Sequence, residues 1–109
     1  MTRTRVVEES WESMQARLHR TAADLQSMLD QLTSQRRAAR YWKLERALKA
    51  GLRAAIKWID WTLTAPKPAE AEEAARFVMS LYRLDEAVPR LVDNFHRLME
   101  ATGETYFPG

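Results

Sequence analysis

Arginine, lysine and tryptophan residues are concentrated between positions 36 and 64, where their spacing suggests a binding chemistry. Eight basic residues against Glu45 and Asp60 give this segment a charge of +6, whereas residues 1–35 and 65–109 carry −1 and −3. Lys and Arg neutralise nucleic-acid phosphates, and aromatic rings stack on exposed bases. The candidate nucleic-acid-binding set is therefore Arg36, Arg37, Arg40, Lys43, Arg46, Lys49, Arg53 and Lys57, with Trp42, Trp58 and Trp61.

Three other interpretations of this segment stay open at the level of sequence. Its charges could pair with the acidic residues of positions 65–109, which would make it a solvated structural face. Its tryptophans could widen the apolar stripe and be buried between helices. It could also dock an acidic protein partner. Binding to a membrane surface is less well supported, because the apolar stripe of the segment is needed for packing.

Other reactive residue types occur without the partners that catalysis or metal binding requires. The chain has no Cys and only three Gly, which excludes thiol chemistry and a glycine-rich phosphate loop. Asp93 and His96 have the spacing of one half of a helical di-metal site, but no second copy of the pair exists and His19 stands alone. We expect no enzyme activity, no metal or other cofactor and no small-molecule substrate.

The elements that would position these residues are all predicted to be helices, because the chain is poor in Gly and Pro and rich in helix-forming residues. A first helix is expected over about residues 5–33. Its apolar residues recur at alternating spacings of four and three, which is typical of a seam that packs against other helices or against a second copy of the chain. We call this set the N-terminal seam: Val7, Trp11, Met14, Leu18, Leu25, Met28 and Leu32.

A second long helix is expected over about residues 35–64, with Ser34 as its N-cap, although one helix continuous with the first is an alternative. At 100° per residue, its basic side chains lie opposite an apolar face. That apolar face consists of Tyr41, Leu44, Leu48, Leu52, Ala55, Ile59 and Leu63.

The prolines of Ala65-Pro-Lys-Pro-Ala69 mark a linker at 65–69, with Pro68 suited to the first position of a third helix over about 69–86. Pro89 should kink or end that helix, with Asp85 as a cap for a fourth helix over about 88–102. A short tail, 103–109, follows. The residues expected to be buried in this half are Ala71, Ala74, Phe77, Val78, Leu81, Leu91, Val92, Phe95, Leu98 and Met99.

The predicted fold is a single all-α domain: an antiparallel three- to four-helix bundle with two long N-terminal helices and a Pro-kinked C-terminal arm. No signal peptide or membrane span is evident, so a cytoplasmic location is expected. This plan is similar in kind to small helical subunits of CRISPR-type ribonucleoprotein complexes and of phage or plasmid DNA-packaging and partition systems. The analogy is architectural and rests on no particular residue.

Two functions follow as hypotheses. In the first, the chain is a non-enzymatic subunit of a larger assembly that holds an RNA or DNA backbone, independently of sequence, on its second helix. In the second, it is a protein–protein adaptor or homo-oligomeric scaffold that self-associates through the N-terminal seam and docks an acidic partner on the basic helix. The first predicts salt-dependent binding of oligonucleotides; the second predicts a concentration-dependent oligomer.

Overall fold

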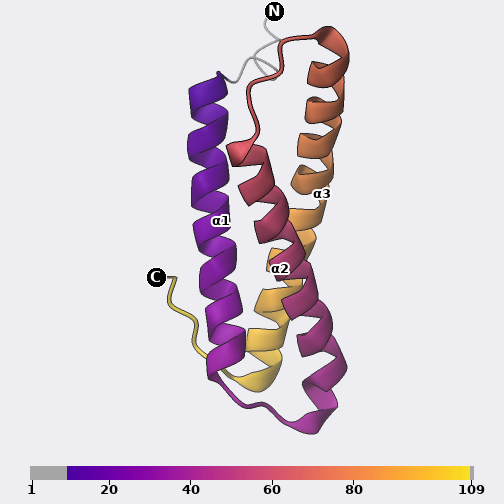
Figure 1. Ribbon diagram of the computed structural model, residues 1–109. Coiled ribbons are helices and arrows are strands. Elements are labelled where there is room, and N and C mark those ends of the chain that lie inside the picture. The colour runs from indigo at the N-terminus through magenta and orange to yellow at the C-terminus, as the bar shows by residue number, and fades with distance from the viewer. Residues whose placement is uncertain (1–9, 109) are drawn as a thin grey trace, which may run out of the picture.

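A computed structural model describes residues 10–108, and throughout this part of the chain the regular structure is helical. Three α-helices, α1 (Trp11–Ser34), α2 (Trp42–Thr64) and α3 (Ala71–Thr102), pack against one another, with α2 running opposite to α1 and α3 (Figure 1). The all-helical prediction is confirmed. At 1.5 Å per residue α1 and α2 are each about 35 Å long, and α3, with 32 residues, is about 48 Å.

Helix α1 begins at a polar cap and buries one face. The Ser10 hydroxyl accepts a hydrogen bond of 3.0 Å from the backbone N–H of Ser13, which satisfies one of the free donors of the first turn. The expected start near residue 5, and with it Val7, lies outside the described residues. The buried side chains of α1 are Met14, Leu18, Leu25, Met28, Leu29 and Leu32.

The connection between α1 and α2 differs from the prediction. Helix α1 ends at Ser34, whose hydroxyl donates to the carbonyl oxygen of Gln31 and does not cap a second helix. Gln35 is extended, and a short 3₁₀ turn, η2 (Ala39–Tyr41), precedes α2. The predicted second helix thus begins seven residues too early. The physical reason is the side chain of Arg37, which occupies a buried polar cluster and holds this segment away from helical geometry.

The predicted boundary between a third and a fourth helix is wrong, because α3 continues through Pro89 as one helix. Proline removes one backbone hydrogen bond, but Pro89 lies on the exposed side, where water can satisfy the freed carbonyl. Buried Leu84 and Phe95 hold the two halves on the same core. Asp85 caps nothing; it lies inside α3, and its carboxylate is 3.3 Å from the guanidinium of Arg17 on α1.

Of the two ends of α3, one differs from the prediction made from the sequence and the other agrees with it. Pro68 lies in the linker and not in the first helical turn, which begins after Glu70 and contains Glu72 and Glu73. These carboxylates favour a helix N-terminus through its dipole. At the other end Gly103 has φ 71°, a left-handed conformation that glycine adopts without steric cost, so the predicted C-terminal cap is confirmed.

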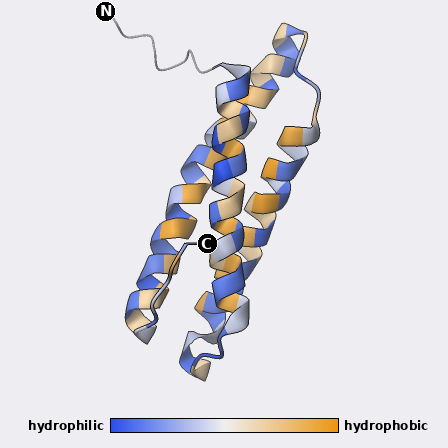
Figure 2. Ribbon diagram, turned by 90° about the vertical axis from the view of Figure 1, so that its left-hand side faces the viewer, coloured by the Kyte–Doolittle hydropathy of each residue, from blue (hydrophilic) through white to orange (hydrophobic). Residues whose placement is uncertain are grey.

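Hydrophobic residues recur along all three helices (Figure 2), and the core takes its side chains from every one of them. Leu25, Leu32, Leu52, Ile59, Phe95 and Leu98 are fully buried. After α3 the chain turns back, and the ring of Tyr106 packs edge-on against Phe95 with a centroid distance of 4.8 Å. Three predicted core residues are exposed instead: Leu44 on α2, and Ala71 and Val78 on α3.

Candidate nucleic-acid interface

Four of the candidate basic residues form an exposed stripe along α2. Lys43, Arg46, Arg53 and Lys57 all point to solvent, and no carboxylate among the described residues lies within ion-pair distance of any of them. Among the described residues, three acidic side chains of α3 pair with other arginines: Asp85 with Arg17 on α1, Glu72 with Arg76 and Asp93 with Arg97. We call Lys43, Arg46, Arg53 and Lys57 the α2 basic stripe.

The stripe is about 21 Å long, since Lys57 lies fourteen positions after Lys43 in the helix. B-DNA carries one phosphate charge per about 1.7 Å of axis when both strands are counted, so a length of duplex equal to the stripe carries about a dozen phosphates, of which four cations can contact only a few. One acidic residue, Asp60, is exposed close to the end of the stripe and has no basic partner among the described residues. An approaching polyanion therefore meets four unneutralised cations and one anion on this face.

Lys49 is the candidate on α2 that is already neutralised. Its Nζ lies 2.9 Å from Oε2 of Glu45, one helical turn earlier. Because the other carboxylate oxygen of Glu45 lies 3.3 Å from Arg37, this glutamate bridges two of the candidate cations. Lys49 and Arg37 are therefore poorer phosphate ligands than the stripe.

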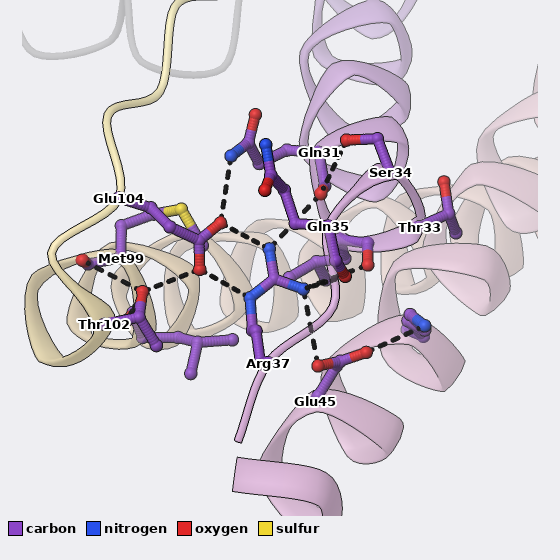
Figure 3. Close-up of polar contacts among 12 residues, drawn as sticks. Gln31, Thr33, Ser34, Gln35, Arg37, Glu45, Met99, Thr102 and Glu104 are labelled. Atoms are coloured by element: carbon purple, nitrogen blue, oxygen red, sulfur yellow. Dashed lines mark hydrogen bonds and ion pairs between the residues drawn. The ribbon is translucent and has the colours of Figure 1, made fainter. Parts of the chain in front are cut away.

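Arg37 is removed from the interface by burial (Figure 3). Its side chain is only 2% exposed, and its Nε and Nη2 each donate a 2.6 Å hydrogen bond to the carboxylate of Glu104. Nη1 donates to the carbonyl of Leu32 at 3.0 Å and Nη2 to that of Gln31 at 3.2 Å. We call the set Arg37, Glu45 and Glu104 the arginine clamp. It joins the end of α1, the start of α2 and the segment after α3.

The arginine clamp shifts the titration of its two most buried members. Burial alone would raise the pKa of Glu104, but hydrogen bonds from Arg37, Thr102 and Gln31, together with the charge of Arg37, outweigh burial and lower that pKa. Burial alone would lower the pKa of Arg37, and the carboxylates of Glu104 and Glu45 raise it instead. Both residues are thus charged at neutral pH, and the clamp is a structural ion pair.

Arg36 lies in the connection between α1 and α2, Arg40 lies in η2, and both remain exposed. Arg36 makes no contact that would neutralise its charge among the described residues. Arg40 donates to the hydroxyl of Tyr41 at 3.2 Å, with its guanidinium 5.0 Å from the centre of that ring. Neither contact removes its charge, but both arginines line a hollow beside Ala101 and Thr102 at the end of α3, away from Arg53 and Lys57, which face α1.

All three tryptophans of α2 are exposed, which contradicts the interpretation that they are buried between helices. Trp42 and Trp61 are each 56% exposed and Trp58 is 38% exposed. The guanidinium of Arg46 lies 5.2 Å from the centre of the Trp42 ring. Trp58 and Trp61 form a tilted pair with ring centres 5.6 Å apart. Exposed rings next to unpaired cations are what stacking on unpaired bases requires.

The N-terminal seam is not an external surface. Met14, Leu18, Leu25, Met28 and Leu32 are buried in the core, and Trp11 is partly buried against the ring of Phe77, 5.3 Å away. Packing within the molecule therefore uses every described residue of the seam. Self-association through the same residues would compete with this packing, which is the helix-packing alternative for the seam.

The remaining polar candidates lie apart from one another. The carboxylate of Asp93 is 3.2 Å from Nε of Arg97, and the ring of His96 lies edge-on to Phe95. His19 is on α1, at the side of a shallow hollow that Arg53 and Lys57 also line. In the part of the chain that the structure describes, no three His, Cys, Asp or Glu side chains gather as a metal site would require.

Comparison of the chain with protein-family models, with curated proteins and with solved structures found no match. None of the described helices has the length and apolar character to cross a membrane.

Proposed function

We propose that the chain is a non-enzymatic subunit that binds the phosphate backbone of a nucleic acid through the α2 basic stripe. The observation that carries the proposal is that Lys43, Arg46, Arg53 and Lys57 are exposed together and have no carboxylate partner among the described residues. Arginine and lysine on a solvated structural face are commonly paired along the helix, as Lys49 is with Glu45. Four unpaired cations on one face favour an external anion.

Recognition would be independent of base sequence. The contacts available on the stripe are charges on long side chains, which bind phosphates and carry no sequence information. Trp61 and Trp42 would add stacking on unpaired bases, which every base allows. This combination favours a single strand, because in a duplex the faces of the bases are already stacked.

Titration of labelled single- and double-stranded oligonucleotides across a salt series tests the proposal. With four phosphate contacts, log K should fall with log salt with a slope of about −3 for a single strand and about −3.6 for a duplex. The triple variant Arg46→Glu, Arg53→Glu and Lys57→Glu should abolish binding.

A matched control variant makes the same change in net charge outside the stripe, at three exposed residues of α1 and α3: Arg20→Glu, Arg76→Glu and Arg97→Glu. It should weaken binding only slightly. Absence of binding at low salt, or equal losses in the two triple variants, would show that the stripe does not hold the ligand. Trp61→Ala should weaken binding of the single strand by about 1–3 kcal/mol and leave the duplex nearly unaffected.

A further inference from the structure

A groove lies between α2 and α3, on a different side of α2 from the basic stripe. Its volume is about 560 Å³, and its floor is made by small residues of α2, including Gly51 and Ala54, with Leu91 of α3. Trp58 lines the α2 side, and Arg83 and Arg90 line the α3 side. We call it the α2–α3 groove.

The groove is hollow because the side chains at its floor are small. A Cβ atom added to Gly51 would lie 2.6 Å from Cδ2 of Leu91, so the side chain of Leu91 packs directly on the backbone of α2 at this point. Ala54 is exposed beside it and fills little of the space next to Trp58. The result is an apolar floor that a side chain or a helix from outside can reach.

The charges beside the groove indicate the chemistry of a surface that could bind in it. Arg83 and Arg90 are exposed, and no carboxylate among the described residues pairs with either. An occupant therefore needs apolar side chains for the floor and a negative charge for these two arginines.

The same molecule carries a surface with these properties. On the outer side of α3, Val78, Met79 and Tyr82 are 45%, 54% and 56% exposed. Glu86 is one turn beyond Tyr82, is also exposed and has no basic partner among the described residues. Val78, Tyr82 and Glu86 are spaced four residues apart and so share one helix face. We call Val78, Met79, Tyr82 and Glu86 the α3 ridge.

We propose that the α3 ridge of one molecule docks in the α2–α3 groove of a second copy. Tyr82 and Met79 would pack on the apolar floor beside Trp58, and Glu86 would face Arg83 and Arg90. The lengths agree: the groove runs about 16 Å along α3, from Arg83 to Asn94, and the ridge about 12 Å. Trp, Tyr, Met and Arg are also the residues enriched in protein interfaces.

Such a contact is heterologous, because groove and ridge consist of different residues, although they adjoin along α3, where Arg83 and Arg90 each follow a ridge residue by one turn. Each molecule offers its ridge to one neighbour and its groove to another, so the assembly grows head to tail. This interface replaces the buried N-terminal seam as the route to self-association. It does not depend on nucleic-acid binding, because none of the α2 basic stripe contributes to either surface.

Sedimentation equilibrium of the purified chain over a concentration series, up to about 1 mM, tests the proposal. The unmodified protein should show a mass that rises with concentration. The groove variant Arg83→Glu/Arg90→Glu and the ridge variant Met79→Ala/Tyr82→Ala should each remain monomeric. All four residues are exposed, so the variants should keep the helical circular dichroism of the parent. Arg20→Glu/Arg97→Glu, a charge-matched control on other surfaces, should associate like the parent.

The decisive sample is an equimolar mixture of the groove and ridge variants. One variant keeps an intact ridge and the other an intact groove, so the mixture should form a one-to-one dimer and nothing larger. A parent protein that stays monomeric, a groove or ridge variant that still associates, or a mixture that stays monomeric would overturn the proposal. Failure of the oligonucleotide titration would leave these outcomes unchanged, so the two proposals are tested separately.

Discussion

Replacing Glu104 by alanine should destabilise the fold more than any other exchange of a single acidic residue of α3 or the segment after it. The change leaves the guanidinium of Arg37, whose side chain is 2% exposed, without its bidentate partner. Removing one member of a buried ion pair costs about 3–5 kcal/mol, because the remaining charge stays buried and unpaired. Arg37 keeps Glu45 at 3.3 Å and the carbonyl of Leu32 at 3.0 Å. We therefore expect the lower end, a loss of about 3 kcal/mol in the free energy of unfolding.

Urea unfolding followed by far-UV circular dichroism measures this loss, and the melting temperature should fall by about 12 °C or more. Glu100→Ala, which removes an exposed carboxylate one turn earlier, is the matched control and should change the unfolding free energy by no more than about 0.5 kcal/mol. In the double variant Arg37→Met/Glu104→Ala the buried charge leaves with its partner, so it should be more stable than Glu104→Ala alone. Equal losses for Glu104→Ala and Glu100→Ala, or a double variant less stable than the single one, would refute this account of the clamp.

Three further predictions follow from the core and the clamp. Because the folded-state pKa of Glu104 lies below its unfolded-state value, its contribution to stability is present above about pH 4.3 and is lost as the pH falls through the folded-state pKa. Unfolding curves measured at decreasing pH should therefore show a steeper loss for the parent than for Glu104→Gln, and parallel losses would contradict the assignment. Gly51→Val should lower the free energy of unfolding by about 1–3 kcal/mol more than the exposed control Ala50→Val, because the added atoms meet Leu91 at the helix contact. Thermal melts of both variants check this difference. Leu18→Glu should abolish cooperative unfolding, since it places a carboxylate in a site that is 2% exposed; a folded monomer by circular dichroism and sedimentation would show that the seam is an external surface after all.

Periodicity predicted most of the buried residues of the helices, although Leu44, Ala71 and Val78 are exposed. The apolar spacing that contains Leu18, Leu25 and Leu32 identified the buried side of α1, and the spacing of Leu52 and Ile59 identified that of α2. Such patterns are local, and hydrophobic burial depends mainly on which face of a helix a residue occupies. The cap at the end of α3 was predictable for a similar reason, because glycine alone adopts a positive φ without cost.

The two wrong boundaries depend on contacts between distant segments. The break before α2 depends on Arg37 meeting Glu104, 67 residues further along the chain, and no local pattern indicates that pairing. The continuity of α3 through Pro89 depends on core packing on both sides of the proline, at Leu84 and Phe95. Proline costs a helix interior about 3 kcal/mol, and burial of large side chains can outweigh that cost.

The candidate interface was predictable as a segment but not residue by residue. All its members are basic or aromatic, so the sequence does not distinguish Arg37, which is buried, from Arg36, which is exposed. It does not distinguish Lys49, paired with Glu45, from Lys43 either. Which cations remain available depends on the three-dimensional neighbours of each, and only the structure supplies those. The groove beside Arg83 and Arg90 escaped sequence analysis because it is formed jointly by two helices.

The arginine clamp also has a consequence for how fast the protein unfolds. Its ion pair joins residues 67 positions apart, so it can form only after all three helices have come together. Interactions absent from the folding transition state slow unfolding and leave the folding rate almost unchanged. If Glu104→Ala costs about 3 kcal/mol, and the clamp is absent from the transition state, that variant should unfold faster on the order of 100-fold. We therefore expect Glu104, which lies outside every helix, to affect the unfolding rate much more than the folding rate.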